Sequence, residues 1–296
     1  MPQSNQNQTK NTAEGQQPAP SPTGKADISI SLSAGTLYHL KLSEIFNIAR
    51  ECDFDGVELI INQVFEKRDP RPIIEKLMKI HPISSIHSPF FKIAGWGNQI
   101  KTLIKVIELA GEFNIPLVNF HPPLWYPPEL TFWRWFRKVE DFQRLAKNNN
   151  TIVTIENMPY VGNRIRFNPN ILRKTEDMTS FIEKHNLYMT FDTTHLGSHN
   201  PNFLVGFKQF YQTGRIRNIH FSDYGHGREH LFPGRGLLPL TRFLYLLKHL
   251  QYQGPLTVEL SPVELPPTHD KIITSLRNLL EYLREETSWR QPTAAN

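Results

Sequence analysis

The sequence predicts one α/β domain, a closed (β/α)8 barrel of the TIM type, and three observations favour it. Short apolar or β-branched runs recur along the chain, and each is typical of a buried strand. From position 87 to position 259 they return at intervals of 28 to 39 residues, which is room for a strand, a loop and a helix. Parallel strands need such helical crossovers. Eight units fit between residues 27 and 286, and a closed barrel needs about 250 residues.

The elements follow in order. The first strand is expected at 28–32, and the helix after it at 43–52 has Ser43 as a candidate N-cap. The second strand is expected at 56–60, and its helix at 70–80 begins with a proline, whose missing N–H is harmless in a first turn.

The later units repeat this arrangement. The third strand, 83–87, precedes a helix at 99–113 with one apolar face, and the last helix spans 269–285. The other strands end at His121, Glu156, Asp192, His220 and Glu259. The long loops follow strands four, five and seven, at 122–128, 157–169 and 223–236.

Composition limits the class of protein. The net charge is only +5 and the basic residues are scattered, so a nucleic-acid face is not favoured. Cys52 is the single cysteine and cannot form an internal disulfide, which favours a reducing compartment. We find no signal peptide and no apolar stretch long enough to cross a membrane, so we expect a cytoplasmic protein.

The two ends of the chain differ from the middle. Residues 1–26 are polar and almost free of apolar side chains, so they cannot offset the entropy of ordering and are expected to form a disordered tail. Residues 287–296 are expected to fray for the same reason. One barrel domain, 27–286, remains.

The strand ends carry the chemistry. Six expected strands finish in a residue that can bind a metal or move a proton, namely His87, His121, Glu156, Asp192, His220 and Glu259. Strand carboxyl ends and the loops after them form the active sites of such barrels, so these side chains are expected to converge at one rim.

Four of these residues form the most specific set. Glu156, Asp192, His220 and Glu259 offer three carboxylates and one imidazole, a set that suits one divalent ion. Oxygen-rich ligands favour Mn²⁺, Mg²⁺ or Co²⁺, and Zn²⁺ is possible. The alternative is that each is an unrelated surface carboxylate or a hydrogen-bonded core histidine.

Eight short motifs place these residues in a known context. They are Asp55-Gly56-Val57-Glu58-Leu59, Ile86-His87-Ser88-Pro89, Phe120-His121-Pro122-Pro123, Ile155-Glu156-Asn157, Phe191-Asp192-Thr193-Thr194-His195, Ile219-His220-Phe221-Ser222-Asp223, Pro233-Gly234-Arg235-Gly236 and Val258-Glu259-Leu260. Each motif is weak, but their order and spacing resemble the xylose isomerase-like barrel superfamily over nearly all of 27–285. That superfamily includes sugar and sugar-phosphate isomerases and epimerases together with endonuclease IV.

The resemblance implies roles for the residues. The four ligands would hold a single divalent metal, and Glu156 and Glu259 would exchange the proton of a substrate carbon between them. A metal-dependent isomerase or epimerase of a small sugar, sugar phosphate or polyol is the leading interpretation. Further residues are expected to bind the substrate or to support the ligands: His87, His121, His195, Arg228, His230, Arg235 and Glu58.

Two other functions stay open. A zinc phosphodiesterase of the endonuclease IV type would need an Asp-x-His after strand seven, where this chain has Arg228-Glu229-His230, and a guanidinium cannot bind a cation. A barrel without chemistry would have no reason to keep all four ligands. The expected partner is a small polyhydroxylated substrate, and a homo-oligomer is possible because the aromatic cluster Phe132, Trp133, Trp135 and Phe136 suits a core or a subunit contact.

Overall fold

A computed structural model describes residues 28–147, 150–161 and 167–288, and within them eight parallel strands close into a barrel in the order β1-β10-β7-β6-β5-β4-β3-β2. The predicted fold class is confirmed. The barrel strands are β1 Ile30–Ser33, β2 Gly56–Ile60, β3 Ile83–His87, β4 Leu117–Phe120, β5 Ile152–Glu156, β6 Tyr188–Asp192, β7 Ile216–Phe221 and β10 Leu256–Val258. The predicted tail 1–26 and the final residues 289–296 lie outside the described residues.

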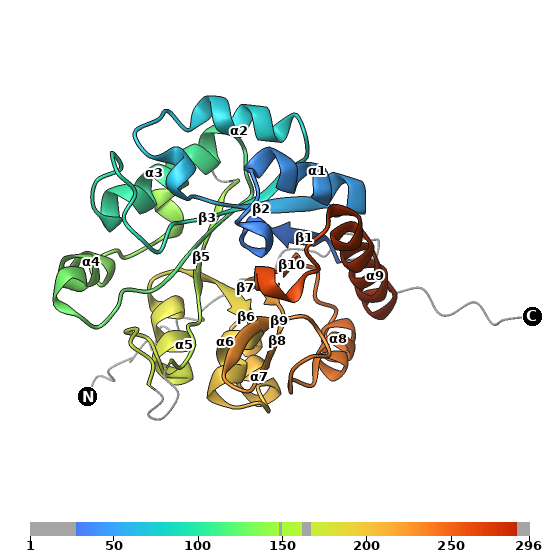
Figure 1. The fold of residues 1–296 in the computed structure, drawn as a ribbon. Helices are drawn as coiled ribbons and strands as arrows, with labels where there is room; N and C mark the ends of the chain where they lie inside the picture. Colours follow the sequence, from blue (N-terminus) through green and yellow to red (C-terminus); the bar gives the residue numbers. More distant parts are fainter. Residues whose placement is uncertain (1–27, 148–149, 162–166, 289–296) are drawn as a thin grey trace, which may run out of the picture.

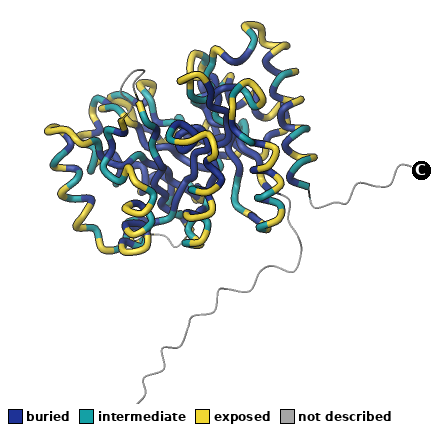
Figure 2. The backbone as a smooth tube through the Cα atoms, turned by 90° about the horizontal axis from the view of Figure 1, so that it is seen from below, coloured by how far each residue is buried: buried dark blue, intermediate teal, exposed yellow. Residues whose placement is uncertain are grey.

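Helices surround the strands, and Figure 1 shows them as a ring around the barrel. They are α1 Leu42–Cys52, α2 Arg71–Met78, α3 Gln99–Glu112, α4 Leu130–Phe136, α5 Thr175–Lys184, α6 Thr193–His199, α7 Leu204–Gln212, α8 Leu240–His249 and α9 His269–Thr287. In Figure 2, which draws the backbone as a tube, the buried segments lie in the interior of the molecule and the exposed segments lie at its periphery. Among the described residues, we find no helix long and apolar enough to cross a membrane.

Each barrel strand alternates between an apolar and a polar face, as the period of two in a strand requires. The apolar positions, such as Ile30 and Leu32 of β1, belong to the core shared with the helices. The polar positions meet one another across neighbouring strands. Thr154 Oγ1 of β5 lies 2.8 Å from Thr190 Oγ1 of β6 and donates to Asn119 Oδ1 of β4 at 3.3 Å. The barrel interior is therefore hydrogen-bonded as well as packed.

Several predicted boundaries need correction. Ser43 does not cap α1: the helix begins at Leu42, and the Glu44 carboxylate accepts the N–H of the capping residue Lys41 at 3.1 Å. The first strand is 30–33 rather than 28–32, because it pairs from Ile30 onward with β10. The final helix continues through Thr287, whose buried hydroxyl donates to the Leu283 carbonyl, so fraying does not begin at 287.

The segment 223–236, expected to be a loop, contains an antiparallel hairpin. Strands β8 Asp223–Gly225 and β9 Arg228–Leu231 form a two-stranded sheet beside the barrel. A tight turn carries the chain between them, with positive φ at His226 and Gly227. The hairpin places His230 next to the ends of the barrel strands.

Candidate metal centre

The four predicted ligands come together at the carboxyl ends of four neighbouring strands. Glu156 ends β5, Asp192 ends β6, His220 lies in β7 and Glu259 follows β10. Their ligand atoms all lie within 4.8 Å of one another. Three of the side chains are fully enclosed, and the Glu259 side chain keeps 17% of its surface exposed. One side of the group is thus open to a ligand.

His220 stands at the middle of this group. Its Nδ1 lies 2.8 Å from Glu259 Oε2, 3.5 Å from Glu156 Oε1 and 3.8 Å from Asp192 Oδ2. Among the described residues, neither this Nδ1 nor Asp192 Oδ2 makes a hydrogen bond of good geometry, although both atoms are buried. Unpaired buried polar atoms are costly. A divalent cation among these atoms would satisfy both of them, so the residues present fit a metal.

Glu58 of β2 supports His220 from behind. Its Oε2 lies 3.2 Å from His220 Nε2 and accepts the Ser85 hydroxyl at 2.9 Å. A carboxylate behind a ligand histidine fixes its tautomer, because it accepts the remaining ring proton. When the ring is neutral, as metal binding requires, Glu58 therefore favours the tautomer with the proton on Nε2 and the lone pair of Nδ1 facing the other predicted ligands.

The electrostatics of the group match a cation site. Burial alone would lower the pKa of His220, but the carboxylates of Glu58 and Glu156 outweigh it and raise that pKa well above its ordinary value. Burial alone would raise the pKa of Glu259, but the adjacent His220 lowers it to about 2. Burial raises the pKa of Asp192 to about 6. In the metal-free protein, the proton held by His220 thus supplies positive charge among the carboxylates, and a bound metal would replace it.

Two further groups of ligand atoms adjoin the first. His87, His121 and Glu156 form one, and Asp192, His195 and His230 form the other. His87 Nε2 lies 3.2 Å and His121 Nε2 3.5 Å from Glu156 Oε2. The group of four predicted ligands thus shares Glu156 with His87 and His121, and shares Asp192 with His195 and His230.

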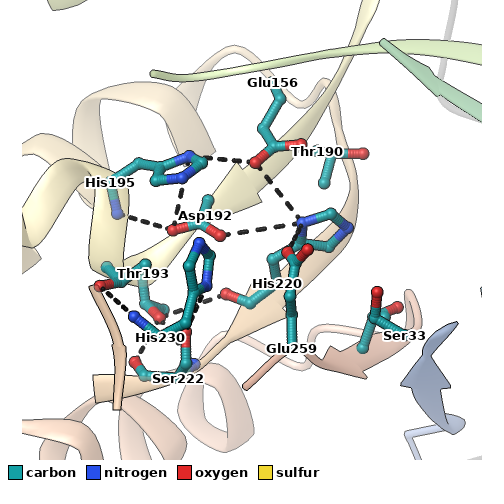
Figure 3. Close-up of polar contacts among 12 residues, drawn as sticks. Ser33, Glu156, Thr190, Asp192, Thr193, His195, His220, Ser222, His230 and Glu259 are labelled. Carbon is teal, nitrogen blue, oxygen red and sulfur yellow. Dashed lines mark hydrogen bonds and ion pairs between the residues drawn. The ribbon is translucent and has the colours of Figure 1, made fainter. Parts of the chain in front are cut away.

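His195, on the first turn of α6, lies between two of these groups. Its Nδ1 is 3.0 Å from Glu156 Oε1 and 3.7 Å from Asp192 Oδ1 (Figure 3). Burial would lower its pKa, but the Asp192 and Glu156 carboxylates raise it to about 10. Its ring also lies edge to face with His230, with centroids 5.2 Å apart.

Arg228 and Arg235 have a different partner in the structure. Both guanidinium groups bind the buried Glu264, which lies in the short 3-10 helix Pro262–Glu264 after β10. Both arginine side chains remain 59% exposed. Substrate contact by these arginines stays a prediction. In the structure, their ion pairs with Glu264 connect the hairpin and the turn 233–236 to the barrel.

Two asparagines to which the sequence assigns no role at the metal centre support its residues. Asn119, inside β4, donates to Glu156 Oε2 at 2.5 Å. Asn157 accepts the N–H of Asp192 at 2.8 Å and donates to its carbonyl at 3.0 Å, joining two ligand strands. No local pattern marks Asn119, because it is the one polar residue in the short run Leu117–Phe120. The Glu264 pairing has no local signal, because its partners lie far away in sequence.

Comparison with known proteins identifies the family. The model of the xylose isomerase-like TIM barrel family matches residues 46–285, and the chain belongs to that family. An uncharacterized protein of Mycobacterium leprae is 25% identical over 263 residues, covering 79% of this chain and 89% of its own length. An uncharacterized protein of Methanocaldococcus jannaschii is 24% identical over 193 residues, covering 62% of this chain and 67% of its own.

Solved structures share the fold. A D-tagatose 3-epimerase-like protein superposes with a TM-score of 0.68 at 18% identity, covering 88% of this chain and 98% of its own. An L-ribulose 3-epimerase gives 0.62 at 13% identity, with coverage of 90% and 100%. The probable 3-DHS dehydratase AsbF of Bacillus anthracis gives 0.60 at 14% identity, with coverage of 86% and 99%. At these identities the likeness establishes the fold alone.

Proposed function

We propose that this barrel is a divalent-metal-dependent isomerase or epimerase of a small sugar, sugar phosphate or polyol. One observation carries the proposal: Glu156, Asp192, His220 and Glu259 place their ligand atoms within 4.8 Å of one another at the active-site rim of the barrel. The resemblance in fold to an L-ribulose 3-epimerase supports the same reaction class. Three carboxylates with one imidazole favour Mn²⁺, Mg²⁺ or Co²⁺.

Glu156 and Glu259 are the proposed proton carriers. A bound cation would polarise a substrate carbonyl and the neighbouring hydroxyl, making the adjacent C–H acidic. One carboxylate then accepts the proton from carbon, and the electron pair moves onto the carbonyl oxygen. Strands β6 and β7 separate β5 from β10 in the barrel, so the two carboxylates reach the centre from different directions. Return of the proton to the same carbon by the second carboxylate inverts that carbon. Return by the first carboxylate to the former carbonyl carbon, with the proton of the neighbouring hydroxyl passing to the former carbonyl oxygen, moves the carbonyl.

The donors around Glu156 distinguish the two glutamates. Its Oε2 accepts from Asn119, and four histidines lie within 3.5 Å of its carboxylate, namely His87, His121, His195 and His220. Glu259 Oε2 lies 2.8 Å from His220 Nδ1, and the Glu259 side chain is the more exposed of the two, at 17% against 1% for Glu156. We therefore assign the first proton abstraction to Glu259. Glu156 is assigned to position the substrate and to return the proton.

The test is isotope exchange at carbon. Metal-loaded protein incubated with ketoses and their phosphates in D₂O should place deuterium beside the carbonyl of the true substrate. Glu156→Gln and Glu259→Gln should each lower kcat by roughly 10²-fold or more. Glu183→Gln, an exposed carboxylate on α5, is the matched control and should retain full activity. Full turnover by Glu259→Gln with metal still bound would contradict the assignment.

A second candidate has its own observation. The three adjoining ligand groups, joined through Glu156 and Asp192, suit several zinc ions, as in a phosphodiesterase of the endonuclease IV type. Arg228 opposes it, because an arginine stands where the extra zinc would need an aspartate. Metal analysis of purified protein separates the two candidates. One Mn²⁺-like ion supports the isomerase, whereas two or three zincs with cleavage of abasic DNA would replace it.

A further inference from the structure

A cavity of about 500 Å³ adjoins the candidate metal centre. His121 and His195 form part of its wall, so it is continuous with the ligand groups. It extends from there between the loops that follow β3, β4 and β5 toward α3 and α4. Most of its lining is apolar, and the side chains that matter here are Phe90, Leu103, Leu124, Phe132 and Met158.

This lining does not match a small sugar alone. A monosaccharide carries a hydroxyl on nearly every carbon, and each hydroxyl buried without a partner is costly. The metal centre offers polar partners, but the cavity beyond it offers mainly rings and aliphatic chains. Pockets of this size commonly enclose ligands well beyond a triose or pentose, held by apolar contacts with a few polar groups for orientation.

Phe90 marks the mouth of the cavity. Its ring lies nearly parallel to that of His121, with centroids 5.7 Å apart and planes 16° apart, and 64% of the residue is exposed. Covering such an exposed aromatic ring with an apolar group of a ligand removes apolar surface from water and so favours binding. Phe90 is therefore placed to bridge the metal centre and the cavity.

The opposite wall is held by a buried carboxylate. Glu129, at the start of α4, accepts the N–H of Leu124 at 2.7 Å and the side-chain amide of Gln99 on α3. These bonds join the loop after β4 to two helices. The apolar wall is thus fixed before a ligand arrives, and a fixed wall lowers the entropy lost on binding.

We propose that the substrate of this centre carries an apolar group the size of an aromatic ring, which fills the cavity while its oxygen-bearing end binds at the four ligands. The proposal rests on the proposed function, since it takes the metal centre as the site of reaction. It replaces a free small sugar by a polyol or hydroxyketone joined to a ring or a branched aliphatic chain.

Hydroxamates test the proposal, because their head chelates divalent metals and their tail can be varied. Binding of acetohydroxamate and of 3-phenylpropionohydroxamate to the Mn²⁺-loaded protein is measured by calorimetry. We expect the phenyl tail to tighten binding roughly tenfold or more. Phe90→Ala and Leu124→Asn should each remove most of that gain. Because Phe90 packs on His121, only Leu124→Asn is expected to leave acetohydroxamate binding unchanged. Tyr245→Ala, an aromatic residue on α8 with 68% exposure, is the matched control and should keep the gain.

The outcomes separate the two proposals. Equal binding of both hydroxamates would overturn the apolar substrate class and leave the metal-dependent function standing. Failure of both to bind, with no metal retained, would overturn the function. In that case, binding of 3-phenylpropionamide to the metal-free protein, measured by saturation-transfer NMR, tests whether the cavity accepts an apolar group. Binding lost in Leu124→Asn supports an apolar site, and no binding overturns it. If Phe90→Ala instead dissociates an oligomer without changing the phenyl gain, the mouth is a subunit contact and the proposal fails.

Discussion

Glu58 lies against the nitrogen of His220 that faces away from the other proposed ligands. The carboxylate is completely buried, and its Oε2 lies near both His220 Nε2 and the Ser85 hydroxyl. Its Oε1 has no hydrogen-bond partner among the described residues. Burying a carboxylate so incompletely paired is unfavourable for stability alone. The arrangement is explained if Glu58 is kept there to orient and polarise His220.

Replacement of Glu58 tests this role. Glu58→Gln keeps the size of the side chain but removes the charge that polarises His220, so affinity for Mn²⁺ should fall roughly tenfold or more. Competition with a fluorescent chelator measures the change, and circular dichroism checks that the barrel is intact. Glu183→Gln serves as the control and should bind like the wild type. Unchanged affinity in a folded Glu58→Gln protein would show that the orienting role is wrong.

At this scale the sequence marks candidate site residues at strand ends more readily than the residues that hold them in place. His87, His121 and Glu156 each follow an apolar run, and a polar residue at the end of such a run is easy to recognise. Asn119 lies inside an apolar run, where a single polar residue does not reveal that every second residue of the strand faces a polar interior. Its bond to Glu156 joins β4 to β5, and only the register of the two strands reveals it.

Among the elements, the β8–β9 hairpin has the most consequence for the site. Asp223 begins it, and this buried carboxylate accepts the backbone N–H groups of Tyr224, Gly234, Gly236 and Leu238 at 2.8 to 3.0 Å. A side chain at position 236 would collide with the carboxylate, because a Cβ there would lie 2.3 Å from Asp223 Oδ1. Glycine is therefore required at 236 for close approach, and the turn is fixed against the hairpin that carries His230.

We expect Glu264 to hold this hairpin in its observed conformation. Glu264→Gln leaves two guanidinium groups without their carboxylate, so we expect a loss of about 1–2 kcal/mol in the free energy of unfolding. Amide exchange in 228–235 should quicken, measured by mass spectrometry. The control is Glu112→Gln, whose partner Arg71 is half exposed, and its loss should stay below about 1 kcal/mol. Equal effects from the two variants would contradict a special role for Glu264.

Cys52 reports on the packing of α1 against α9. Its thiol is buried and lies 3.7 Å from the Ile273 carbonyl. Burial raises its pKa to about 11 from 9.0. The folded state thus favours the neutral thiol. This contribution to stability is present below about pH 9 and is lost as the pH rises through 11.

Thiol labelling tests the Cys52 environment. At pH 8 a thiol with this pKa holds about 100-fold less thiolate than it does in the unfolded chain, and the reagent also has to reach it. Labelling of native protein should therefore be slower than labelling in guanidinium by about 100-fold or more, followed by absorbance. Comparable rates in the two conditions would show that α1 and α9 open readily.

On the scale of the whole molecule, the barrel has an apolar outside and a polar inside. Val118 and Phe120 of β4 belong to the core, whereas Asn119 between them contacts Glu156. The sequence could predict eight strands and helices, because outward apolar residues set the repeat. It could not predict the polar interior, because the inward residues are few in each short strand and their partners lie on other strands.

This architecture couples metal binding to the stability of the barrel. The four proposed ligands come from β5, β6, β7 and the residue after β10, so a bound ion would join strands that are brought together only by folding. A ligand that binds only the native state stabilises it by about 2.7 kcal/mol at 100 times its Kd. For a domain of this size that corresponds to a rise in Tm of roughly 5–10 °C.

Calorimetric melting of chelator-stripped and Mn²⁺-loaded protein measures this rise. Asp192→Asn should abolish most of it, because the variant removes the charge of a ligand shared by two of the groups. Glu183→Gln should show the full wild-type shift, since its carboxylate is exposed on α5. A stoichiometrically bound ion that left Tm unchanged would mean that the ion binds the folded and the unfolded chain equally, and so is not held by a site that only folding assembles. The shared rim of β5, β6, β7 and β10 would then have to be explained by hydrogen bonding alone.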